Sequence, residues 1–185
     1  MFNEKEVVTR ILNGDMRAFE LLVKQYERLV FYVIHRLVKE QQGAEDICQE
    51  VFIKVYNGLV RFNFQSKLST WIARIAYLTA INYLRKYNRE KASGYPDDIE
   101  SYHFTVDTPE LLFTKKDTAN YIEQLILQLP EKYRTVLTLY HLNEFSGPEI
   151  EQITGMPEGT VKNYLFRARK LLKEKLEVYL KNELP

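Results

Sequence analysis

The chain has 185 residues, enough for one domain or two small ones, and its hydrophobic content of 45% excludes an intrinsically disordered protein. The single cysteine, Cys48, excludes an intramolecular disulfide and suits a reducing cytosol, and the lack of a long uncharged apolar run excludes a transmembrane helix. The net charge is only +1, but basic residues gather at 85–91 and 162–175, and acidic residues at 45–50 and 97–110. This segregation predicts one polyanionic partner and one partly basic partner.

The first ten residues carry too many charges for a signal peptide, so we expect a cytoplasmic protein. Apolar residues recur at helical spacing along nearly the whole chain, and no segment alternates as a strand would. In the first half we expect four helices, at about residues 4–13, 16–38, 44–60 and 69–91. Asp15 suits the N-cap of the second helix, Gly43 with the two glutamines before it is expected to break the chain ahead of the third, and Ser66 or Ser69 can cap the fourth.

Residues 93–113 have no clean period and contain glycine, proline and several acidic residues, a composition typical of a flexible linker. Helices resume near Thr114. Pro130 ends the first of them, another runs from Glu131 to about Asn143, and two more follow. The expected fold is therefore all-α, with two small helical domains joined by a flexible linker.

The most informative local pattern is the segment 145–175, which reads FSGPEIEQITGMPEGTVKNYLFRARKLLKEK. Ser146 and Glu149 match a capping box that starts a short helix, and Gly155 suits the positive φ that ends it. A longer helix with a basic exposed face follows. This is the layout of a helix-turn-helix, whose second helix lies in the DNA major groove. The alternative is an amphipathic surface helix with a solvated charged face.

The second helix of this motif has two distinct faces. An apolar stripe at spacings of three and four is expected to be buried, and it consists of Val161, Leu165, Ala168, Leu172 and Leu176. On the other face, lysine and arginine can bond guanine edges, asparagine can bond adenine edges, and a phenylalanine can meet a thymine methyl group. The candidate DNA-reading residues are Thr160, Lys162, Asn163, Phe166, Arg167 and Lys170.

The third helix carries an acidic patch, in which Asp46, Gln49 and Glu50 share one side at helical spacing, with Phe52 beside them. Like charges four residues apart cost a few tenths of a kcal/mol in an isolated helix. One interpretation is a docking patch for a basic partner. The other, which the physical chemistry alone favours, is a solvated face with Phe52 in the core.

The fourth helix interleaves aromatic with basic residues. Its aromatic residues are Trp71, Tyr77, Tyr83 and Tyr87, and its basic residues are Arg74, Arg85, Lys86 and Arg89. Such a mixture suits single-stranded DNA, because any base can stack on an aromatic ring and the phosphates need cations. A core tryptophan with amphipathic tyrosines and a solvated basic end explains the pattern equally well.

The sequence has no Walker loop, no zinc-protease motif and no cysteine–histidine metal spacing, and its three histidines are scattered. We therefore expect no catalytic site, no cofactor, no bound metal and no small-molecule substrate.

These features occur in an order that resembles a known family. The segments that carry the resemblance are, in chain order, AFELLVKQYERLVFYVIHRLV, GAEDICQEVFIKVYNGL, STWIARIA and LPEKYRTVLTLYHLNEFSGPEIEQITGMPEGTVKNYLFRARKLL. Over these segments the chain is similar to the extracytoplasmic-function (ECF) group of bacterial RNA polymerase sigma factors. The resemblance implies a promoter-specificity subunit of RNA polymerase that is not itself an enzyme.

The resemblance also implies a division of labour. Residues 1–92 would be sigma region 2, residues 93–113 a linker that threads the RNA exit path, and residues 114–185 region 4, which reads the −35 element and meets the β flap of the polymerase core. The third helix would dock on the β′ clamp helices through Asp46, Gln49, Glu50 and Phe52. The fourth helix and the loop before it would capture unstacked bases of the −10 element through Phe62, Asn63, Ser66, Trp71, Arg74, Asn82, Arg85 and Lys86. An anti-sigma factor is a further implied partner.

Two departures from the family pattern affect the −10 site. The family usually carries RIA-x-N-x-x-x-D, whereas this chain has Leu78 and Asn82 at the two matching positions, so we assign Leu78 no base contact. The loop 62–66 lacks the usual glycine and arginine, so we expect an atypical base preference at −10. Two other functions stay open at this point. One is a stand-alone regulator that binds a duplex operator as a dimer, and the other is a helical protein–protein adaptor.

Overall fold

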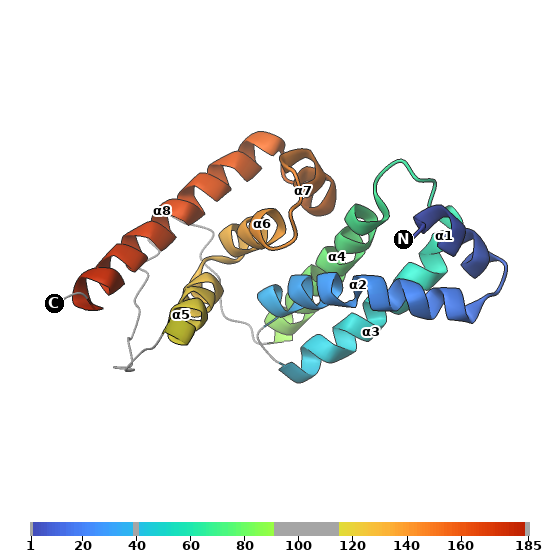
Figure 1. Cartoon of the computed structure of the whole chain (residues 1–185), viewed down its shortest axis with the longest axis horizontal. Coiled ribbons are helices and arrows are strands. Elements are labelled where there is room, and N and C mark those ends of the chain that lie inside the picture. Colours follow the sequence, from blue (N-terminus) through green and yellow to red (C-terminus); the bar gives the residue numbers. More distant parts are fainter. Residues whose placement is uncertain (1, 39–40, 91–114, 184–185) are drawn as a thin grey trace.

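The computed structural model describes residues 2–38, 41–90 and 115–183, and every regular element within these ranges is a helix. The first half contains α1 (Glu4–Leu12), α2 (Met16–Leu37), α3 (Gln41–Gly58), the 3-10 turn η1 (Leu59–Arg61) and α4 (Leu68–Glu90) (Figure 1). The second half contains α5 (Lys115–Gln128), α6 (Glu131–His141), α7 (Gly147–Thr154) and α8 (Glu158–Glu183). The predicted all-α fold is confirmed, and the linker predicted at 93–113 lies outside the described residues. No helix in the described ranges is long and apolar enough to cross a membrane.

Three of the predicted helix boundaries are confirmed, namely those at Asp15, at Ser146 with Glu149, and at Gly155. Asp15 caps α2, since its Oδ1 accepts from the backbone N–H groups of Arg17 at 3.0 Å and Ala18 at 3.2 Å. The pKa of this carboxyl is lowered, most by the hydrogen bond from Arg10 and less by those from the helix N–H groups. Before α7, the backbone N–H of Ser146 donates to Oε2 of Glu149 at 2.9 Å in the predicted capping box. Gly155 ends α7 with φ of 77°, the left-handed conformation.

The predicted break at residues 41–43 is wrong, because these residues form the first turn of α3. The second helix ends earlier, at Leu37, where Val38 takes an extended conformation. Gly43 instead marks a close approach between helices, since a Cβ atom there would lie 2.6 Å from the hydroxyl oxygen of Tyr83 on α4. Gly43 is therefore needed for the packing of α3 against α4 and does not break the helix. Similarly, α4 begins at Leu68, between the two serines that the sequence offered as caps.

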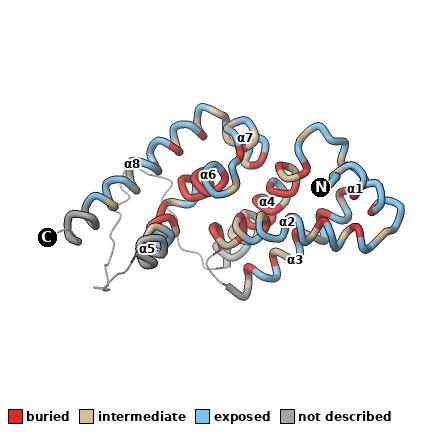
Figure 2. Tube along the Cα trace, viewed as in Figure 1, coloured by how far each residue is buried: buried red, intermediate tan, exposed pale blue. Residues whose placement is uncertain are grey.

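The two halves pack against each other, which the sequence did not predict. Helix α7 lies on α4, and α6 lies on α2 (Figure 1). A cluster of buried side chains joins Leu22, Ile34 and Ile72 of the first half to residues of the second half, namely Val136, Leu139, Phe145, Ile150 and Ile153. Figure 2 shows buried positions along α2, α4, α6 and α7, the helices that meet between the halves. A smaller cluster beneath α8 contains Ile126, Leu129, Tyr133, Leu137 and Ala168. The larger of the two clusters therefore extends through both halves.

A polar contact also bridges the halves. The guanidinium of Arg36 on α2 donates to Oε1 of Glu123 on α5 at 2.6 Å. The Arg36 side chain is only 9% exposed, whereas that of Glu123 is 51% exposed. A buried guanidinium needs a partner, so this pair helps to hold α5 beside α2.

Candidate nucleic-acid interface

Helix α8 presents the polar face that the sequence predicted. Its apolar stripe turns inward, with Val161, Leu165 and Ala168 buried and the later leucines half-buried. The candidate DNA-reading side chains Lys162, Asn163, Phe166, Arg167 and Lys170 are exposed, and Thr160 is half-buried. Phe166 is 67% exposed, among the most exposed large apolar side chains of the described residues. The exposed ring contributes nothing to the core and is accessible to a partner on this face.

Acidic residues one turn away accompany the lysines of this face. The ammonium group of Lys162 lies 2.9 Å from Oε1 of Glu158, and that of Lys170 lies 3.9 Å from Oε1 of Glu174. The Lys162 side chain is 70% exposed, so this ion pair is weak and its cation can turn toward another anion. The face can therefore offer its positive charges to a phosphate or a base edge.

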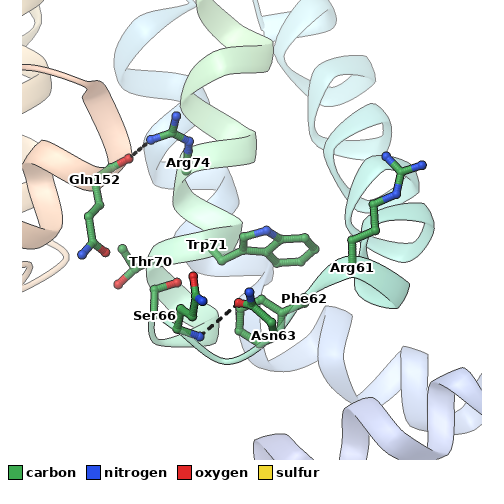
Figure 3. Close-up of a pocket in the computed structure, with 9 residues that line it drawn as sticks. Arg61, Phe62, Asn63, Ser66, Thr70, Trp71, Arg74 and Gln152 are labelled. Atoms are coloured by element: carbon green, nitrogen blue, oxygen red, sulfur yellow. Dashed lines mark hydrogen bonds between the residues drawn. The ribbon is translucent and has the colours of Figure 1, made fainter.

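A pocket of about 330 Å³ opens beside the first turns of α4 (Figure 3). Its aromatic wall is made by Phe62 and Trp71, whose ring centroids are 5.0 Å apart and whose planes are inclined by 37°. The rest of the lining is polar or cationic and consists of Arg61, Asn63, Gln65, Ser66, Thr70, Arg74 and Gln152. An apolar wall with amides, hydroxyls and two guanidinium groups suits one planar, hydrogen-bonding ring next to an anionic chain.

The loop that shapes this pocket is held by its own side chains. Oδ1 of Asn63 accepts from the backbone N–H of Gln65 at 3.3 Å (Figure 3). Phe64, at the tip, has a positive φ of 58°, which is uncommon for an aromatic residue, and its ring lies 4.7 Å from that of Phe62. The tilted contact between the Phe62 and Phe64 rings and the Asn63 turn therefore stabilise the shape of the loop.

The acidic side of α3 is open to solvent. Asp46, Gln49 and Glu50 are exposed, and Glu50 is paired with Lys54 on the same helix at 2.6 Å. Phe52 is half-buried and packs against the core, which matches the structural interpretation of this residue more than the docking one. Two apolar residues continue the acidic side along the helix, Ile53 at 61% and Tyr56 at 38% exposure. Acidic and apolar groups on one exposed helix face can meet a helical partner that has basic and apolar groups.

The comparisons with known proteins cover both halves. Residues 22–90 match the family model described as Sigma-70 region 2, and residues 119–172 match the model described as Sigma-70, region 4. RNA polymerase sigma-H factor of Pseudomonas aeruginosa is 34% identical over an alignment of 185 residues, and the alignment covers 96% of this chain and 96% of that one. ECF RNA polymerase sigma-E factor of Escherichia coli (strain K12) is 35% identical over 181 residues, which cover 94% of each chain. The chain belongs to the ECF RNA polymerase sigma factors.

Solved structures share the fold of this sigma factor. CnrH in complex with the cytosolic domain of CnrY matches with a TM-score of 0.67 and 17% identity, over 95% of this chain and 97% of that one. The sigma factor RpoE in complex with the anti-sigma factor NepR, from Bartonella quintana, matches with a TM-score of 0.68 and 22% identity, over 86% of this chain and 97% of that one. The family consists of DNA-binding transcription initiation factors, so the sigma factor is not expected to catalyse a reaction of its own.

The structure brings together only part of the predicted −10 site of the sigma factor. Five of the predicted residues line the pocket, namely Phe62, Asn63, Ser66, Trp71 and Arg74. Asn82, Arg85 and Lys86 are exposed but lie two to three turns farther along α4. Arg74, Leu78, Asn82 and Arg85 follow each other at spacings of four, four and three, so they form a stripe on one face of the helix. Leu78 is 42% exposed in this stripe, an apolar surface residue where the family usually has asparagine.

Four lining residues of the pocket were missed. Arg61 and Gln65 belong to the same loop as predicted residues, and Thr70 precedes Arg74 by four positions on α4, so helical spacing could have found it. Gln152 comes from α7 in the other half of the chain, and no local pattern links it to this loop.

We expect Gly58→Ala to disturb the pocket wall. Gly58 ends α3 directly against Trp71, and a Cβ atom there would lie 2.9 Å from Cζ2 of the indole. Because the ring is wedged in the wall and cannot shift freely, the added methyl should cost about 1–3 kcal/mol of stability. Trp71 is the single tryptophan of the chain, so a change in its fluorescence emission reports the disturbed pocket wall. A thermal denaturation curve measures the loss of stability.

Gly159→Ala is the matched control for this substitution. Gly159 lies in the first turn of α8, and an added Cβ atom would meet nothing within 4 Å. Alanine there should leave the tryptophan emission unchanged and the stability unchanged or higher, by about 0.5–1 kcal/mol. If Gly58→Ala behaved like this control, the tight contact with Trp71 would be disproved.

Proposed function

We propose that this sigma factor directs RNA polymerase core in the bacterial cytoplasm to promoters whose −35 element it reads as duplex and whose −10 element it captures as a single strand. The observation that carries the proposal is the presence on one chain of two exposed surfaces of different chemistry. One is the exposed polar face of α8, and the other is the aromatic pocket beside α4. The first suits paired DNA and the second suits unpaired bases.

The duplex part rests on α8. An α-helix fits the major groove, where Lys162 or Arg167 can bond guanine, Asn163 can bond adenine, and Phe166 can contact a thymine methyl group. Glu158 and Glu174 hold the neighbouring lysines by weak ion pairs that phosphates can replace. The short helix α7 before it would cross the DNA backbone, as in other helix-turn-helix proteins.

The single-strand part rests on the pocket and on the stripe along α4. Extruding a base from the stack costs a few kcal/mol, which stacking on Trp71 and Phe62 and hydrogen bonds from the loop amides would offset. Arg74 at the pocket and Arg85 farther along the stripe would follow the phosphates. Leu78, between them, is an exposed apolar residue where the family usually offers a polar side chain, and the loss of that side chain supports an atypical base preference at −10.

The contact with core polymerase rests on α3. In this family the acidic helix of region 2 docks on the β′ clamp helices, and here Asp46, Gln49 and Glu50 are exposed for that contact. We add Ile53 and Tyr56 to this surface because they are exposed apolar residues on the same side of the helix. Region 4 would meet the β flap, and the linker between the two regions would follow the RNA exit path.

We also propose an anti-sigma factor as a partner of the free chain. The similar structures of CnrH and of the Bartonella quintana sigma factor were solved as complexes, the second with a protein named as an anti-sigma factor. Their low identity to this chain supports the likeness of fold and does not identify the partner.

Run-off transcription with core polymerase on a randomised promoter library tests the proposal. We expect transcripts only when the sigma factor is added, with enriched sequence blocks near −35 and −10. The free protein should bind the enriched duplex weakly, because strand capture needs DNA that the polymerase has melted. Tight and specific duplex binding by the free chain, with two symmetric half-sites, would instead favour a dimeric regulator. Lack of any DNA-dependent effect would favour an adaptor.

A further inference from the structure

The loop before α4 holds an aromatic ring just outside the pocket. Phe64 does not line the pocket, and it is 39% exposed. Its φ of 58° lies in the left-handed region, which a residue with a Cβ atom adopts only at a cost in free energy. In the part of the chain that the structure describes, Phe64 belongs to neither buried cluster. Burial in the core therefore does not explain why an aromatic residue takes this conformation.

The Phe64 ring extends the aromatic wall of the pocket. Its centroid lies 4.7 Å from that of Phe62, which in turn lies 5.0 Å from that of Trp71. The three rings thus form a continuous aromatic surface that runs from the pocket wall to the tip of the loop. Proteins that bind single strands stack successive bases on such neighbouring rings. A strand with one base in the pocket therefore has a second ring within reach of the next base.

A cation from α1 reaches the same ring. Helix α1 packs beside η1, which leads into the loop (Figure 1). Nζ of Lys5 lies 5.9 Å from the centroid of the Phe64 ring, at the outer limit of a cation–π contact. Because Lys5 is exposed, this contact is weak. The ammonium group can therefore leave the ring for the phosphate of a nucleotide whose base stacks there.

The acidic residues on both sides of Lys5 leave its charge available. Glu4 and Glu6 are the acidic residues of the first turn of α1. Oε1 of Glu4 accepts from the hydroxyl of Tyr26, a buried residue of α2, at 2.7 Å, so this carboxylate is directed toward the core. Glu6 is adjacent to Lys5 in sequence, and adjacent positions of a helix do not face each other.

We propose that Phe64 and Lys5 form a second nucleotide subsite beside the pocket, in which Phe64 stacks the base next to the captured one and Lys5 binds the phosphate of that nucleotide. The ligand of the loop is then two successive nucleotides of a single DNA strand. This inference rests on the proposed capture of the −10 strand and adds two residues to it. The glycine that the family usually has in this loop has no ring, so the second subsite is a property of this chain.

The test uses the holoenzyme and a promoter enriched from the randomised library, with a preformed bubble at −10. The displaced strand carries one abasic site, which is moved one position at a time. The position with the largest loss of affinity marks the base in the pocket. We expect a second sensitive position directly beside it, with affinity lower by about five-fold or more, the lower end of what stacking of one base contributes. If neither neighbour of the pocket base is sensitive, the second subsite is disproved.

Phe64→Leu connects the second position to the ring. Leucine keeps the Cβ atom and the apolar character but cannot stack, so the intact strand should bind about five-fold or more weakly. An abasic site at the second position should then cause no further loss, because the two changes remove the same contact. Phe64→Tyr keeps a ring and should restore the sensitivity. Sensitivity that persists in Phe64→Leu, or that is lost in Phe64→Tyr, would overturn the inference.

Tyr140→Leu is the matched control for the loss of an exposed ring. Tyr140 on α6 is also 39% exposed, and its ring also lies near a cation, with Cζ of Arg169 at 5.2 Å from the centroid. This variant should keep the sensitivity of the second position. An equal loss in Tyr140→Leu would show that the effect does not come from the loop.

Lys5→Gln tests the phosphate contact. Loss of one contact to a single strand should reduce the slope of log affinity against log salt concentration by about 0.7. Lys24→Gln is the control, because it removes an exposed lysine from α2 and changes the net charge equally. Equal slopes for the two variants would overturn the assignment of Lys5 to the subsite.

The wild-type data separate this inference from the proposed function. If the holoenzyme shows no sensitive position anywhere in the displaced strand, the proposed strand capture fails. If one position is sensitive but its neighbours and the Phe64 variants do not respond as described, only the inference about the second subsite fails.

Discussion

Reversing the charge of Asp46 and Glu50 should abolish the binding of this sigma factor to core RNA polymerase while leaving its fold intact. Both residues are exposed on α3, so the substitutions Asp46→Lys and Glu50→Lys remove no buried contact. Among the described residues, the substitutions remove the ion pair between Glu50 and Lys54, whose charged atoms lie 2.6 Å apart. Both side chains of this pair are exposed, so its loss should cost about 0.3–0.5 kcal/mol of stability. Against a basic partner, like charges cost several kcal/mol, which corresponds to a loss of affinity of about a hundredfold or more.

Native gel or fluorescence anisotropy with purified core measures this affinity, and circular dichroism with a thermal melt checks the fold. The matched control is the double variant Glu174→Lys and Glu177→Lys, which reverses two exposed charges on α8, away from α3 (Figure 1). Both control residues also pair with a lysine one turn away. Normal core affinity of the α3 variant would refute a docking surface on α3.

The second large effect is expected on the recognition helix, where Lys162→Ala or Arg167→Ala should cost about 1–3 kcal/mol of promoter discrimination if either residue bonds a base edge. The Lys162 side chain is 70% exposed and its pair with Glu158 is weak, so alanine there should change the stability by less than about 0.5 kcal/mol. A loss of discrimination would therefore come from the DNA contact. The measurement compares the affinity of the holoenzyme for promoters that differ by single base pairs in the −35 element.

Lys173→Ala controls for the removal of a lysine from α8. Its side chain is 76% exposed and pairs with Glu177 at 3.7 Å, and it lies three turns beyond Lys162. Equal weakening on all sequences by Lys162→Ala would assign this residue to a phosphate instead of a base. If neither variant at Lys162 or Arg167 changed any promoter affinity more than Lys173→Ala, α8 would not be the reading helix.

Most of the helical fold could be predicted because its signals are local. The cap at Asp15, the box of Ser146 with Glu149, and the left-handed Gly155 are each determined by residues within four positions, and the structure confirms them. The exposed face of α8 follows from the same helical period that buries Val161 and Leu165.

The errors come from contacts between distant segments. Gly43 has the composition of a breaker, but its role is set by Tyr83, forty residues away on α4. The pocket beside α4 could be predicted in part, since its loop and the start of α4 are contiguous. The side that Gln152 forms could not be predicted, because Gln152 reaches the pocket only through the packing of α7 on α4, which depends on the whole arrangement of helices.

A buried cluster running through both halves makes temperature a variable in the behaviour of the free protein. Separating the halves brings Phe145 and its apolar neighbours on α4 and α7 into water, and the attraction between such groups weakens on cooling. The apolar contribution to the contact between the halves therefore falls as the temperature drops.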